Sequence, residues 1–171
     1  AIPMTGPIGG FLPFLATVVR ELGGGVEVLK SNSKSLANGE HLCNSFDSCG
    51  PVKIAHSICD IEKDYLFFPK IMKFYDRQGP GGIACVTEQA MPEVVEQGLK
   101  ARGKNVTVIR PRLYLENGLT EADVIESLAP LATALGADRS TLAQAVEKGA
   151  HAQKTFEEAL EKIGQEAIDY A

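Results

Sequence analysis

The chain has 171 residues, 44% of them hydrophobic, which is typical of a globular domain able to bury a core and not of a disordered segment. Its formal net charge of −5, with no run of clustered Lys and Arg, argues against nucleic acid as a partner. No apolar run reaches the roughly 18 residues of a membrane-spanning helix, so no membrane partner is expected. Four unevenly spaced cysteines predict reduced thiols and a cytoplasmic protein.

The first third of the chain alternates short apolar segments with amphipathic ones. Residues 2–4 and 26–29 have the pattern of buried strands. Between them, residues 11–22 carry apolar side chains at helical spacing, and the glycines of 23–25 end that helix. Pro51 then fits the first turn of a further helix, which is apolar on most sides and therefore expected to be buried.

Three more strands are expected at 65–68, 83–86 and 106–110, and Pro92 starts a helix between the last two. Strands that alternate with helices pair in parallel through right-handed crossovers. The predicted fold class is therefore α/β: a doubly wound, mostly parallel sheet of about four to five short strands, with a helical C-terminal extension.

The C-terminal part of the sequence is helical throughout. Pro130 ends or kinks a first helix, and Asp138 can cap the next one. An apolar stripe then continues for roughly 30 residues, which corresponds to about 45 Å of helix. We therefore divide the chain into an α/β domain, 1–119, and a helical extension, 120–171, that packs on this domain or on a partner domain.

Two glycine-rich loops, 5–10 and 78–82, are expected beside the sheet. Backbone N–H groups of such loops can hold a phosphate, but neither loop has the Lys-Ser/Thr pair of a Walker motif or a full G-x-G-x-x-G. A tight turn is the favoured interpretation of both. Together with Cys85, they should emerge where the carboxyl ends of the strands meet.

Cys49 and Cys85 are the candidate metal ligands, because each is expected at a junction that leads into a helix. Unpaired N–H groups and the positive end of the helix dipole favour a thiolate and anionic clusters there. No two cysteines have C-x-x-C spacing. Cys59 shares an apolar helical stripe and is predicted to be a core residue. Cys43 lies in a polar segment and is a reserve ligand.

A closed zinc site made of His41, Cys43, Cys49 and His56 is a second way to use these residues. His56 alone is more simply explained as a helix histidine with a satisfied hydrogen bond. No Ser-His-Asp or Cys-His arrangement indicates hydrolase chemistry.

The run from Cys49 to Lys53, Cys-Gly-Pro-Val-Lys, resembles the C-x-P-x-K signature of the 2-hydroxyacyl-CoA dehydratase superfamily. It resembles equally the related domain that follows ATP-dependent activase modules in long fused proteins. Residues 65–71, Tyr-Leu-Phe-Phe-Pro-Lys-Ile, are similar to the family's D-Y-I-F-L-P-R-I segment, and Cys85-x3-Gln89-x2-Pro92 follows in the family's order. Roughly residues 1–100 resemble the family well and the helical tail loosely.

This resemblance implies that Cys49 and Cys85 are ligands of a [4Fe-4S] cluster, to which a partner ATP-dependent activase domain or protein delivers an electron. In a dehydratase the reduced cluster acts on a 2-hydroxyacyl-CoA thioester so that its hydroxyl group can leave. The family's third cysteine ligand comes from a later domain, and Val86 stands where the family usually has proline. The site here would be incomplete unless Cys43, Cys59 or a second copy of the chain, as in a homo-oligomer, completes it.

We therefore expect a partial iron–sulfur domain of a dehydratase-like or reductase system that serves ATP-gated, low-potential electron transfer. The opening Ala-Ile-Pro-Met suggests the further hypothesis that the chain is one piece of a longer polypeptide, whose other domains are partners. The alternative is a non-catalytic docking domain, in which the long helix from Asp138 to Tyr170 holds neighbouring domains together while the cysteines stay reduced.

Overall fold

The computed structural model describes residues 1–43, 48–75 and 81–170. In chain order the elements are β1 (Ile2–Pro3), the 3-10 helix η1 (Gly6–Gly9), α1 (Leu12–Glu21), β2 (Val28–Leu29), α2 (Ser35–Leu42), α3 (Gly50–Ile58), β3 (Tyr65–Phe67), β4 (Lys70–Phe74), β5 (Gly82–Ile83), α4 (Val86–Ala101), β6 (Thr107–Ile109), β7 (Arg112–Leu115), α5 (Ala122–Ser127), α6 (Ala129–Ala134) and α7 (Arg139–Tyr170).

Two parallel ladders, which follow one another along the same two chain segments, form the centre of the strand arrangement. β3 pairs with β6 and β4 pairs with β7, both in parallel. Between the two ladders, the Phe68 N–H donates to the Ile109 carbonyl at 2.9 Å and the Lys70 N–H donates to the Pro111 carbonyl at 2.8 Å. Pro69 has no N–H to donate, so the ladder is interrupted there and resumes one residue later.

The outer strands extend this central pair. β1 pairs in parallel with β2, and the Phe67 N–H donates to the Ala1 carbonyl at 2.8 Å, which joins β1 to β3. β5 pairs antiparallel with β4. The α/β class with mostly parallel pairing is confirmed. The expected four to five strands become seven in the described part of the chain, because β4 and β7 resume beyond the prolines at 69 and 111.

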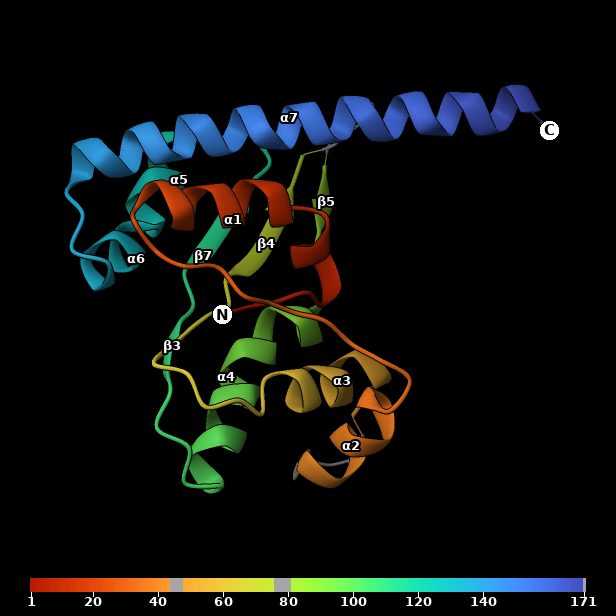
Figure 1. The fold of residues 1–171 in the computed structure, drawn as a ribbon, viewed down its shortest axis with the longest axis vertical. Coiled ribbons are helices and arrows are strands. Elements are labelled where there is room, and N and C mark those ends of the chain that lie inside the picture. Colours follow the sequence, from red (N-terminus) through yellow and green to blue (C-terminus); the bar gives the residue numbers. More distant parts are fainter. Residues whose placement is uncertain (44–47, 76–80, 171) are drawn as a thin grey trace.

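Helices lie on both sides of the strands: α1 and α7 on one side of β4 and β7, and α2, α3 and α4 on the other (Figure 1). A single buried cluster joins the strands to helices of both halves of the chain, including Phe14 of α1, Leu113 of β7, Val95 of α4 and Leu142 of α7. Within the described residues, no helix is both long enough and apolar enough to cross a membrane.

The long C-terminal helix α7 is confirmed, and its first half packs against α1. A Cβ atom added at Gly149 would lie 2.9 Å from both Phe14 Cδ2 and Val18 Cγ2, so the two helices approach closely there. Gln153, which is 2% exposed, accepts a hydrogen bond from the Phe14 N–H at 3.3 Å and donates to the Gly10 carbonyl at 2.8 Å. Gln153 thus satisfies one of the N–H groups that the start of α1 leaves unpaired.

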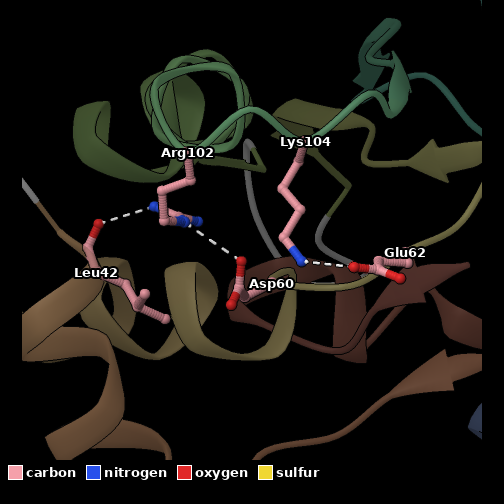
Figure 2. A network of polar contacts seen from close by, with 5 residues as sticks. All are labelled: Leu42, Asp60, Glu62, Arg102 and Lys104. Atoms are coloured by element: carbon pink, nitrogen blue, oxygen red, sulfur yellow. Dashed lines mark hydrogen bonds and ion pairs between the residues drawn. The ribbon is translucent and has the colours of Figure 1, made fainter.

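Polar contacts connect the end of α4 to the segments around α3 (Figure 2). Arg102 donates through Nη1 to the Leu42 carbonyl at 3.0 Å and through Nε to Asp60 Oδ1 at 3.3 Å. Lys104 Nζ lies 3.2 Å from Glu62 Oε1. Because Leu42 is the last residue of α2, Arg102 caps that helix while holding the segment between α3 and β3 to the end of α4.

Candidate cysteine site

Cys49 occupies the N-cap of α3, as the sequence predicted. Its backbone is extended, with φ −65° and ψ 158°, and its carbonyl accepts hydrogen bonds from the N–H groups of Val52 at 3.1 Å and Lys53 at 3.3 Å. Pro51 sits in the first turn, where its missing N–H costs nothing. The Cys49 side chain is exposed, so its thiol is accessible at the positive end of a helix.

Cys85 occupies the N-cap of α4, and here the predicted boundaries were wrong. The helix begins at Val86 and not at Pro92, which lies inside it, and the preceding strand β5 ends at Ile83. The Thr87 hydroxyl lies 3.0 Å from Cys85 Sγ. This hydroxyl, followed by the backbone N–H groups of Thr87 and Glu88, stabilises the thiolate and lowers the pKa of Cys85 below its usual value.

The first glycine-rich loop lies against the first turn of α4, the helix whose N-cap is Cys85. Gly6 has a φ of +50°, and a Cβ atom added there would lie 1.9 Å from Glu88 Oε2. The Glu88 carboxyl group is partly desolvated, which raises its pKa. A carboxyl group in this place disfavours phosphate, and the loop folds into the 3-10 helix η1 and not into the tight turn expected. Part of the second loop, residues 78–80, lies outside the described residues.

The other two cysteines differ from this pair. Cys59 is fully buried, and desolvation raises the pKa of its thiol well above the usual range, so its predicted place in the core is confirmed. Cys43 is half-buried, and its Sγ donates to the Ser48 hydroxyl at 3.4 Å. All four thiols are free of disulfides. Cys59 is therefore no reserve ligand, whereas Cys43 is partly accessible.

The zinc site considered from the sequence does not form. His56 is 2% exposed and packs beside Gly98 of α4, and neither of its ring nitrogens has a hydrogen-bond partner, contrary to the satisfied histidine expected. Burial first, and then the nearby Arg102 charge, lowers the pKa of His56. Across residues 1–43, 48–75 and 81–170, no three His, Cys, Asp or Glu side chains lie close enough together to hold a metal ion.

The donor atoms of Cys49 and Cys85 suit an iron–sulfur cluster, but their number does not complete one. Thiolates at helix N-termini match the ligand type and the negative charge of such clusters. A [4Fe-4S] cluster takes four cysteine ligands, so two exposed cysteines provide about half a set. The residues present therefore fit a shared site and not a closed one.

Two features around Cys85 were missed from the sequence. The neighbouring Ile83 and Val86 are 74% and 76% exposed, which leaves apolar side chains beside an exposed thiol. A cluster of ion pairs also holds α4 on the sheet: Lys70 Nζ lies 2.7 Å from Glu93 Oε1, and Arg110 Nη1 lies 2.7 Å from Glu96 Oε2. Glu93 and Glu96 are three residues apart and so lie on one face of α4, but only the fold supplies their cations.

These features define an α/β domain of mostly parallel strands, with two accessible thiols at helix N-termini. The chain belongs to the family described as "CoA enzyme activase uncharacterised domain (DUF2229)", whose model matches residues 2–171. Neither a curated protein nor a solved structure matches the chain. Family membership confirms the link to CoA enzyme activases that the Cys49–Lys53 motif indicated.

Proposed function

We propose that this domain contributes Cys49 and Cys85 to an iron–sulfur site, the rest of which is supplied by thiolates outside its described residues. The single observation that carries the proposal is the placement of the two cysteines. Each is exposed and each is the N-cap of a helix, whereas Cys59 is buried and caps no helix N-terminus. A thiol placed for packing alone would be buried, as Cys59 is.

The chemistry of Cys85 supports this role. Its pKa is lowered, so more of the thiolate is present near neutral pH, and the thiolate is the form that binds iron. The ion pairs of Lys70 and Arg110 with α4 fix the helix, and with it the position of the Cys85 thiol. The domain therefore offers a preorganised ligand at low cost in side-chain entropy.

A [4Fe-4S] cluster, when bound, accepts and donates a single electron at low potential. In this proposal an ATP-dependent activase domain or protein delivers the electron, in a 2-hydroxyacyl-CoA dehydratase-like or reductase system. The family description supports the activase context. The remaining thiolates come from other domains of a longer parent chain or from a second copy of this one.

Anaerobic reconstitution tests the proposal. The chain is incubated with iron, sulfide and an excess of a small thiol that stands in for the missing ligands. Bound iron, acid-labile sulfide and visible absorption are then measured. We expect a chromophore that is lost in the Cys49→Ser, Cys85→Ser double variant, because both thiolates are removed from exposed positions without disturbing the core.

Cys43→Ser is the matched control, since it removes a thiol that lies outside the proposed pair. It should keep the chromophore, and circular dichroism should show all three chains folded. A chain that binds no iron with the small thiol present contradicts the proposal. So does a double variant that binds as much iron as the parent chain.

A further inference from the structure

Strands β6 and β7 form a free edge of the strand arrangement. Among the described strands, β6 pairs only with β3 and β7 pairs only with β4, so each has one side without a neighbouring strand. The two strands follow one another along residues 107–115, and we call their unpaired side the β6–β7 edge. A strand edge of this kind presents N–H and C=O groups that another strand can pair with.

The hydrogen bonds to the neighbouring strands show which backbone groups point outward. The carbonyls of Ile109 and Pro111 accept bonds from the chain segment of β3 and β4, so these odd-numbered residues face inward. Successive residues of a strand direct their N–H and C=O groups to opposite sides. The backbone groups of Arg110, Arg112 and Tyr114 therefore point outward. The missing N–H of Pro111 belongs to the inward side and leaves the outer edge uninterrupted.

Arg112 is an exposed cation on this edge that lacks an acidic partner. Arg110 pairs with Glu93 and Glu96, and Lys70 pairs with Glu93. Arg112 forms no ion pair or side-chain hydrogen bond with any residue that the structure describes, and its side chain is exposed. The edge therefore carries one positive charge that is available to a ligand from outside.

A groove of about 390 Å³ lies beside Arg112, between the strands and α4. Its lining includes Met72 of β4 and Ala90 and Val94 of α4, together with Arg112 itself. Side chains of a strand alternate between the two faces of a sheet. A strand added next to β7 would thus direct every second side chain to the face that carries the groove, and a carboxylate there would complement Arg112.

The unpaired backbone groups select the kind of occupant. An extended polypeptide segment can bond to them in register, as in other cases of strand addition. A helix cannot, because its own N–H and C=O groups are bonded within the helix. A second copy of the chain that used the same edge would bring Arg110 and Arg112 against the same two arginines, and like charges on paired strands are destabilising.

We propose that the β6–β7 edge accepts an extended segment of a partner polypeptide as an added strand, with carboxylate side chains on the face beside Arg112. The backbone of the segment bonds to the outward N–H and C=O groups of Arg110, Arg112 and Tyr114, and one of its carboxylates pairs with Arg112. This edge does not depend on the cysteines, so it holds or fails independently of the iron–sulfur proposal.

Calorimetric titration of the whole chain tests this edge. The probe is a capped seven-residue peptide in which valine and glutamate alternate. One comparison peptide has lysine in place of glutamate, and another has methyl groups on the backbone nitrogens of its central residues. We expect the glutamate peptide to bind at least 10-fold more tightly than the lysine peptide and to weaken as salt is added. The methylated peptide keeps the charge but loses N–H donors, so it should bind at least 10-fold more weakly.

Arg112→Glu should reverse the preference between the glutamate and lysine peptides. Arg20→Glu is the matched control, because it makes the same change of charge at an exposed position of α1, and it should leave the affinities unchanged. Circular dichroism should show both variants folded. In the parent chain, the bound glutamate peptide should slow hydrogen exchange at the amides of Arg112 and Tyr114.

Four results would overturn the proposal: no binding of the glutamate peptide, equal affinity for the glutamate and lysine peptides, full affinity for the methylated peptide, or an unchanged preference in Arg112→Glu. Self-association of the chain that protects the Arg112 and Tyr114 amides without any peptide would also overturn it. The edge would then be an interface between copies of this chain.

Discussion

At the scale of single residues, His56 shows how packing can oppose ionisation. Its imidazole is 2% exposed between α3 and α4, and no ring nitrogen has a partner. Desolvation, followed by the charge of Arg102, lowers its pKa. The neutral imidazole is therefore part of the folded state, and protonation would place a second cation in the buried contact beside Arg102.

Stability should consequently fall as pH falls below 6.5, the ordinary pKa of histidine. In that range the unfolded chain binds a proton that the folded chain refuses, so folding loses about 1.4 kcal/mol for each unit by which the pKa is lowered. Urea unfolding of the parent chain and of His56→Leu between pH 8 and pH 5 measures this. The variant should show a shallower slope, and identical slopes would mean that His56 titrates normally.

At the scale of elements, the sequence predicted the strands and helices better than it predicted their ends. The start of α4 was assigned to Pro92 because proline favours the first turn of a helix. Cys85 is the N-cap instead, although its side chain makes no capping hydrogen bond and cysteine is not among the preferred N-cap residues. Strand β4, which follows Pro69, was not predicted for a similar reason, because a proline normally ends a strand.

For the candidate site, the local sequence pattern correctly predicted the N-cap position of Cys49 and the burial of Cys59. It did not predict that the ring nitrogens of His56 have no hydrogen-bond partner among the described residues. A cysteine before Gly-Pro predicts an N-cap, and a cysteine on an apolar stripe predicts burial, because both depend on neighbours in the chain. The burial of His56 depends on Gly98, which is distant in sequence and has no side chain that would signal the contact. Tertiary packing of this kind cannot be inferred from periodicity.

Two glycines of α7 should respond in opposite ways to alanine. A Cβ at Gly149 would lie 2.9 Å from two side chains of α1 and 3.0 Å from the Phe14 carbonyl oxygen, whereas a Cβ at Gly164 would meet nothing within 4 Å. Gly149→Ala should lower stability by about 1–3 kcal/mol, because overpacking outweighs helix propensity. Gly164→Ala should increase helicity and leave stability no lower. Thermal unfolding followed by circular dichroism distinguishes them, and a stabilising Gly149→Ala would refute the close α1–α7 contact.

At the scale of the whole molecule, the first half of α7 packs on the rest of the domain, and its second half is exposed. Leu142 and Val146 are part of the same buried cluster as Phe14 and the strands. Glu157, farther along the helix, contacts the body through the hydroxyl group of Tyr75. The folding free energy of the domain should therefore come from residues before this point, and the rest of α7 should contribute little to it.

Truncation tests this division. A chain that ends at Ala159 keeps the Glu157 contact, and its Tm should stay within about 2 °C of the full chain, since residues 160–170 are all exposed. A chain that ends at Ala145 loses the buried Val146 and Gln153, and should be destabilised by more than about 3 kcal/mol. If ending the chain at Ala159 lowered the stability as much as ending it at Ala145, residues 160–170 would have to pack on the body in solution.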